Sequence, residues 1–284
     1  MSATLTTPRP TRPAKPAQQT SVLYDAAGPR GRRRIRNGAL AGGAVVAALA
    51  VVVLIQLGRN GVLDPNRWEV LLNRDLARLL LRGVWSTLQV ALVAIGISIV
   101  GGLLLAAARL SDRAWLRGAA RVWIELFRGL PLLVLIFLIF LGAPAFGIDV
   151  PTFWALTIGI SLYNSAVLCE IFRAGIRSLP RGQTEAAYAI GLRKIEALRV
   201  ILLPQAVKAM LPALVAQVVI ILKETSLGFV IGYTELLREG RVAVEYLGGT
   251  YAIPVYTAVA LVYLLVNYGL SRLAKQLESR RVSR

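Results

Sequence analysis

The chain contains no histidine and only one cysteine, Cys169. A single thiol cannot form a disulfide within the chain, and zinc, haem and histidine-based catalytic sites lose their usual residues. The chain also lacks the G-x-x-x-x-G-K-[ST] sequence of a phosphate-binding loop, so it does not bind ATP through that motif. We therefore expect no metal and no cofactor on this chain, and no enzyme activity, because no nucleophile–base pair is visible.

Charged residues are also scarce: they make up 17% of the 284 residues, against 56% hydrophobic residues, and the mean hydropathy is +0.62. A helix that crosses a bilayer needs about 20 predominantly apolar residues. Runs of Leu, Ala, Val and Ile recur without the period-two alternation of a barrel strand. The sequence predicts an all-α membrane protein with about six transmembrane helices, at roughly 38–58, 84–108, 126–147, 152–170, 209–232 and 253–271.

The net charge of +18 comes from arginine and lysine residues that flank these segments. Nucleic-acid binding explains this charge poorly, because most of the basic residues fall on one predicted side of the membrane, as they do in cytoplasmic loops. We therefore expect a multi-pass protein of the cell membrane with both termini in the cytoplasm. Residues 1–37 are predicted to be a disordered basic arm near the lipid surface, and 272–284 a cytoplasmic tail.

Residues 59–83 are the exception, because they place several arginines on the predicted outer side. Their apolar residues recur at helical spacing, which predicts an amphipathic helix lying on the outer interface. The residues of that apolar face are Trp68, Leu71, Leu72, Leu76, Leu79 and Leu80.

Polar side chains inside or beside the spans are informative because each is costly in hydrocarbon. Two E-x-x-R pairs are predicted to be structural ion pairs, Glu125 with Arg128 and Glu170 with Arg173. Two further groups are candidates for lining a pathway through the membrane, with a packing role as the alternative. They are Tyr163, Asn164 and Ser165 at mid-depth in the fourth span, and Lys223, Glu224, Thr225 and Ser226, which interrupt the fifth span near its middle.

The second span carries a stripe of small residues spaced four apart, a pattern that lets another helix approach closely. We expect packing within the chain, and a subunit interface is the alternative. The residues of the stripe are Ala94, Ser98, Gly102 and Ala106.

Residues 183–206, QTEAAYAIGLRKIEALRVILLPQA, form the most ordered polar stretch between two spans. Pro180 suits the first turn of a helix, Gly191 supplies a break, and a second helix is predicted from about Lys194 to Leu202. Leu203-Pro204 is expected to redirect the chain. Because small residues dominate the first helix, it could enter a partner's cleft deeply; a plain cytoplasmic linker is the alternative.

This stretch resembles the EAA motif of ABC importer permeases, through residues spaced as in that motif: Glu185, Ala186, Ala187, Gly191, Ile201, Leu203 and Pro204. Other segments are similar to motifs of the polar amino-acid uptake subfamily. They are 83–88 (GVWSTL), 125–133 (ELFRGLPLL), 170–176 (EIFRAGI), 180–183 (PRGQ) and 223–227 (KETSL). The resemblance covers roughly 80–277. One departure is SAV at 165–167, where the subfamily usually has Gly-Ala-Tyr, and the tetrad YNSA at 163–166 resembles that of glutamate-type systems.

The resemblance implies a five-helix permease core at 84–271 with one extra N-terminal helix at 38–58, and a cytoplasmic coupling loop near 173–207. In such importers the loop docks on a separate ATPase subunit, which holds ATP and magnesium, and Glu185, Ala187 and Gly191 would be the key docking positions. A second permease subunit, identical or paralogous, and an external amino-acid-binding protein would complete the assembly. An ion-coupled secondary transporter is the alternative, with Glu170 and Glu224 as the available membrane carboxylates.

Overall fold

The computed structural model describes residues 28–282, and the chain divides after Gly61 into two units, each described by itself. The first unit is one long helix, α1 (Pro29–Arg59), which is apolar enough to cross a membrane. Its first turns contain the basic cluster from Arg30 to Arg36. The arm predicted at 1–37 is therefore wrong for its last part, where a proline in the first turn opens a helix. Residues 1–27 lie outside the described part.

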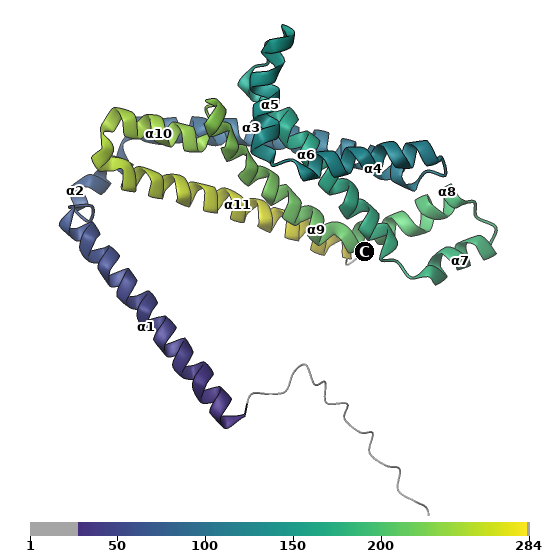
Figure 1. The fold of residues 1–284 in the computed structure, drawn as a ribbon, viewed down its shortest axis with the longest axis horizontal. Helices are drawn as coiled ribbons and strands as arrows, with labels where there is room; N and C mark the ends of the chain where they lie inside the picture. The colour runs from purple at the N-terminus through teal and green to yellow at the C-terminus, as the bar shows by residue number, and fades with distance from the viewer. Residues whose placement is uncertain (1–27, 283–284) are drawn as a thin grey trace, which may run out of the picture. The chain divides into compact units, whose positions relative to one another are not determined.

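The second unit is a bundle of helices (Figure 1). Its elements are α2 (Pro65–Trp68), a 3₁₀ turn η2 (Glu69–Leu72), α3 (Arg74–Leu110), α4 (Ala114–Gly129), α5 (Leu132–Gly142), η3 (Ala143–Phe146), α6 (Thr152–Arg177), α7 (Arg181–Ala189), α8 (Lys194–Ala197), a π-helical segment η4 (Leu198–Leu202), α9 (Leu203–Glu224), η5 (Thr225–Ile231), α10 (Leu236–Leu247), η6 (Gly249–Tyr251) and α11 (Ala252–Val282).

The helical membrane class is confirmed. Within residues 28–282 no strand is formed, and five helices are long and apolar enough to cross a membrane, or six if one bent pair counts as a single span. In the second unit the long candidates are Arg74–Leu110, Thr152–Arg177, Leu198–Ile231 and Gly249–Arg272. The last helix, α11, continues to Val282, so the predicted tail is helical over 272–282.

The span predicted at 126–147 is broken inside, because α4 and α5 meet there at an angle of 97° and make one span only as a bent pair. The break lies at Leu130 and Pro131. A residue before proline is disfavoured in the α region, and Leu130 has ψ 134°, which is extended. The chain therefore leaves α4 and restarts as α5 in a new direction, which Figure 1 shows as α5 projecting from the bundle.

The outer amphipathic helix predicted within 59–83 is also wrong. Its first part folds as the two short turns α2 and η2, and its second part is the beginning of α3. The Asn73 side chain accepts the Asp75 N–H at 2.8 Å and so caps an unbroken helix of 37 residues. Leu76 and Leu80 are buried against α10 and α11 rather than facing lipid, whereas Leu72 is 84% exposed.

Helix α6 lies at the centre of the second unit, and α3 packs along it through the stripe of small residues. All four members of that stripe are buried. A methyl group added at Gly102 would lie 2.8 Å from the Leu168 Cβ, so the two helices need glycine at this contact. The expected packing within the chain is confirmed. Cys169 is fully buried beside Leu168, in the hydrophobic cluster that also contains Ala106 of the stripe.

Candidate functional site

The first candidate site is the elbow, residues 181–202, which connects α6 to α9. Helix α7 ends at Ala189 and is followed by Gly191, whose φ of +84° is left-handed and costs other L-residues about 1–2 kcal/mol. Two backbone bonds close this end: Gly191 N–H donates to Tyr188 O at 2.9 Å, and Leu192 N–H donates to Ala187 O at 3.1 Å. The glycine thus sets the angle between α7 and α8.

The second arm of the elbow begins with its own cap. The Arg193 N–H donates to the Glu196 Oε2 at 2.8 Å, while the Ala197 N–H bonds Arg193 O at 2.8 Å. Helix α8 then passes into the π-helical η4 without a break. Bonds within the segment therefore close the central turn of the elbow on both sides.

The side chains of α7 divide into an inner and an outer face. Ala187 is 1% exposed and packs inside the elbow. Glu185, Ala186 and Ile190 are exposed, Ile190 by 74%. A methyl group added at Gly191 would meet nothing within 4 Å. The outer face thus carries no side-chain bulk at Gly191 and little at Ala186, beside the exposed Ile190, and the buried Ala187 serves the packing of the elbow itself.

The expected change of direction at Leu203 and Pro204 is wrong, because η4 continues directly into α9. Leu203 N–H bonds Leu198 O, five residues back, and Pro204 falls in the first turn of α9, where its missing N–H is tolerated. Ile201 is half-buried along this stretch. Any movement of the elbow is consequently joined to α9 by a continuous backbone.

One ion pair ties the elbow to the turn between α3 and α4. Lys194 Nζ pairs with the Asp112 carboxylate, and both side chains are largely exposed. Lys194 holds the pKa of Asp112 below its usual range by a hydrogen bond and by its charge. Arg117 Nη1 donates to the carbonyls of Ser111 and Asp112, at 2.9 and 2.7 Å, which closes the turn itself.

The second candidate site is a buried polar network between α6 and α9. The Asn164 Nδ2 donates to the Glu224 Oε2 at 2.6 Å and to the Ile160 carbonyl at 2.9 Å. The Asn164 Oδ1 accepts from the Gln217 Nε2 at 2.6 Å. Asn164 is fully buried, so its amide is satisfied entirely by protein groups. Three polar side chains therefore join two spans inside the bundle.

The remaining pathway candidates lie around this network without joining it. Ser165, Thr225 and Ser226 each donate to the backbone carbonyl three residues earlier, at 2.7–2.8 Å. Tyr163 is half-buried and Lys223 is exposed. The residues 223–226 occupy the junction of α9 and η5, in the last third of the span Leu198–Ile231, so the expected position near its middle is wrong.

The two expected ion pairs differ. Arg173 Nε donates to the Glu170 Oε2 at 3.0 Å, so that pair is formed. The Glu125 carboxylate instead lies 3.5 Å from the Nε of Arg121, one turn earlier on α4, and the Glu125–Arg128 expectation is wrong. Arg128 lies in the last turn of α4 before the Leu130–Pro131 break.

The sequence also matches a known family over these elements. The family of binding-protein-dependent transport system inner membrane components matches residues 98–283, well over half of the chain. The chain belongs to that family. The matched residues include the elbow, α6 and α9, so both candidate sites lie in the shared part of this permease.

Individual relatives agree with the family. The glutamate transport system permease protein GluD of Corynebacterium glutamicum is 39% identical over 227 residues, which cover 78% of this chain and 82% of the relative. The probable glutamine ABC transporter permease protein GlnP of Bacillus subtilis is 37% identical, with 70% and 91% covered. A crystal structure of an amino acid ABC transporter with histidines superposes with a TM-score of 0.68 at 33% identity, covering 72% of this chain and 94% of that one.

Two partners in the permease's sites were missed by sequence reasoning. Gln217 is a lone amide in an apolar stretch of α9, a signal that could have placed it with Asn164. Asp112 sits 82 residues before Lys194, and nothing in either local sequence indicates that pairing.

Proposed function

We propose that this permease forms half of the membrane pathway of an ATP-binding-cassette importer for polar amino acids, glutamate being the member we favour. A second permease subunit would form the other half, and a separate ATPase subunit would hold ATP and magnesium. The relatives named for glutamate and glutamine transport support the cargo class. The observation that carries the coupling role is the exposed outer face of the elbow, where Gly191 has no side chain and Ala186 only a methyl group.

The elbow would lie on the cytoplasmic side, where an ATPase is available. Basic residues concentrated in the elbow and in the α3–α4 turn support that orientation. The opposite end of the bundle, where α3 begins and α10 lies, would then face an external amino-acid-binding protein.

In the mechanism we propose, closure of the ATPase pair pulls on two docked elbows. Because η4 joins the elbow to α9 without a break, the pull would reach the α6–α9 contact directly. The Gln217–Asn164–Glu224 network spans that contact. Its two spans would rock between inward-open and outward-open arrangements, with ATP shifting the populations of the two states.

Uptake by the complete importer in proteoliposomes tests this proposal. Gly191→Val places a branched side chain at a left-handed position on the outer face, and we expect ATP-dependent uptake to fall at least about tenfold while the protein still inserts. Gly191→Asn is the matched control, because asparagine tolerates this backbone conformation, and it should retain most uptake.

Vanadate separates this proposal from ion-coupled transport. Uptake by the wild-type protein should stop when vanadate inhibits the ATPase. Uptake that persists under vanadate and follows an imposed ion gradient would refute the proposal, and so would normal uptake by Gly191→Val.

A further inference from the structure

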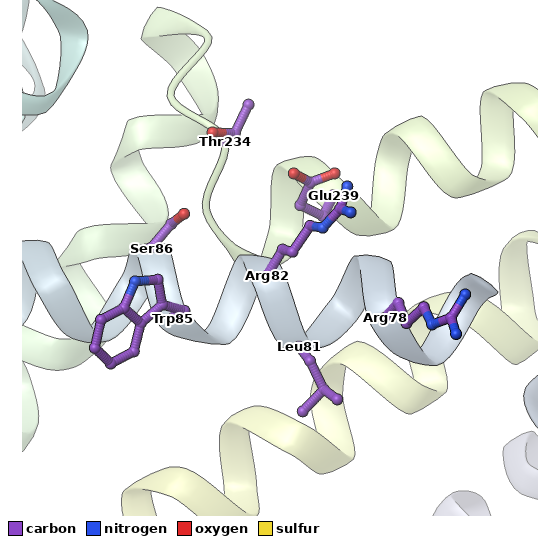
Figure 2. A pocket seen from close by; sticks show the side chains of 7 residues that line it. All are labelled: Arg78, Leu81, Arg82, Trp85, Ser86, Thr234 and Glu239. Carbon is purple, nitrogen blue, oxygen red and sulfur yellow. The ribbon is translucent and has the colours of Figure 1, made fainter. Parts of the chain in front are cut away.

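An open cavity of about 600 Å³, lined by charged, polar and apolar side chains, lies between the first turns of α3 and the beginning of α10 (Figure 2). It is at the end of the second unit away from the elbow (Figure 1). Its size is within the usual range for small-molecule sites, about 300–1,000 Å³. The lining residues are Arg78, Leu81, Arg82, Trp85, Ser86, Thr234 and Glu239.

The walls of this cavity are held by close backbone contacts. A methyl group added at Gly83 would lie 2.7 Å from the Leu236 Cα, so α10 presses directly on α3. The Leu236 N–H donates to the Thr87 hydroxyl at 3.2 Å, and the Tyr233 hydroxyl donates to the Ser86 carbonyl at 3.1 Å. The charged side chains therefore project from a fixed frame.

The charges of the cavity follow a two-to-one pattern. Arg78 and Arg82 are four residues apart on α3 and so share one face of the helix. Glu239 comes from α10, and in Figure 2 its carboxylate and the Arg82 guanidinium point toward each other. Within the described residues these two groups form no ion pair, and Arg78 makes only an exposed contact of 3.4 Å with Asp75. All three charged side chains line the cavity, and a carboxylate that reaches Arg78 would compete only with its long, exposed contact to Asp75.

We propose that this cavity is an entry site for a free acidic amino acid. Arg82 and Arg78 would receive its two carboxylates, Glu239 its ammonium group, and the Trp85 ring its aliphatic stem. Two cations and one anion complement a ligand that carries two anions and one cation. A neutral amino acid leaves one guanidinium unpaired, and a basic one places a cation beside an arginine.

This inference rests on the proposed function, because only an importer delivers a free amino acid to that end of the bundle. The site deepens the proposal by naming the residues that would favour glutamate or aspartate there. An open cavity with a net positive charge also raises the local concentration of an anion, which suits capture after release from a binding protein.

Binding to the permease–ATPase complex in nanodiscs, without any binding protein, tests the site. The probes are L-glutamate, L-glutamine and L-lysine, observed by saturation-transfer NMR. We expect the order glutamate, glutamine, lysine. Arg82→Gln should weaken L-glutamate binding about tenfold and L-glutamine binding less. Glu239→Gln should weaken both about equally, because both ligands carry the ammonium group.

Arg74→Gln is the matched control, since it removes an exposed arginine one turn before Arg78, outside the cavity. Equal L-glutamate binding by Arg82→Gln and Arg74→Gln would overturn the inference. Loss of wild-type binding when phosphatidylglycerol replaces part of the phosphatidylcholine would also overturn it, because lipid phosphates would then be the occupant.

The two proposals fail differently. If vanadate-sensitive uptake occurs but Arg82→Gln binds and imports L-glutamate like the control, only the entry site is refuted. If L-glutamate binds through Arg82 but no uptake responds to ATP, the entry site stands as a binding site and the importer proposal is refuted.

Discussion

The two ends of the second unit are built in opposite ways. At the α10 end, the contact with α3 and α11 is buried: Gly83 touches the Leu236 backbone, and the fully buried Glu235 accepts bonds from Leu237 N–H, Arg238 N–H and the Tyr263 hydroxyl. The elbow at the other end has an exposed outer face and an exposed ion pair. In the function we propose, the buried end is a fixed frame and the exposed elbow is a movable lever.

The largest expected effect is the difference in stability between two glycine-to-valine substitutions, one at each end of the second unit. Gly83→Val should cost about 3 kcal/mol or more, or prevent folding, because its side chain meets backbone at the α3–α10 contact. Gly191→Val should cost less, about 1–2 kcal/mol, because its side chain enters open space and only the left-handed backbone opposes it. Thermal unfolding in detergent checks both. Similar losses for the two variants would remove the contrast between frame and lever.

A smaller loss is expected at the cap of α10. Glu235→Gln replaces one acceptor by a donor and should lower the free energy of unfolding by about 1–3 kcal/mol. Burial raises the pKa of Glu235 despite the bonds it accepts, so the folded state binds its proton more tightly. Wild-type protein should therefore gain stability relative to Glu235→Gln as the pH falls from 8 toward 5. If the stability of the wild type relative to Glu235→Gln instead falls with decreasing pH, the buried carboxylate is stabilised as an anion.

Two neighbouring alanines test the two faces of α7. Ala187→Phe should destabilise the elbow by about 1–3 kcal/mol, because Ala187 is buried. Ala186→Phe should leave stability unchanged and lower ATP-dependent uptake at least about tenfold, because it obstructs the outer face. Unfolding and uptake are measured on the same preparations. If Ala186→Phe transports normally, the outer face is not a docking surface.

The smallest effect is expected at the exposed Asp112–Lys194 pair. Asp112→Asn should increase hydrogen exchange in α8 at neutral pH with little change in the unfolding temperature. Lys194 lowers the pKa of Asp112. The stabilisation by the pair is therefore complete above the ordinary aspartate pKa and is lost as the pH falls through the lowered pKa of Asp112. The difference in α8 hydrogen exchange between wild type and Asp112→Asn should disappear at that low pH and also in high salt. Identical α8 hydrogen exchange in wild type and Asp112→Asn at neutral pH would show that the Asp112–Lys194 pair does not hold the elbow.

The sequence predicted the features that depend on local pattern. The apolar runs predicted the spans, and Gly191 predicted the break in the elbow. Prediction from the sequence failed for features that depend on packing between residues far apart in the chain. Pro131 was visible, yet whether a proline kinks one span or divides two helices depends on the neighbours of α5. The partners of Asn164 are 53 and 60 residues away, and no local spacing identifies them.

Cross-linking from the elbow tests the central claim most directly. With the buried Cys169 replaced by serine, Ala186→Cys gives a permease with one thiol, on the outer face. The account predicts that a short thiol-to-amine cross-linker in intact cells joins it to an ATP-hydrolysing subunit, and that Ala187→Cys, facing inward, gives little product. A well-inserted Ala186→Cys permease that supports uptake yet never captures an ATPase would contradict the account.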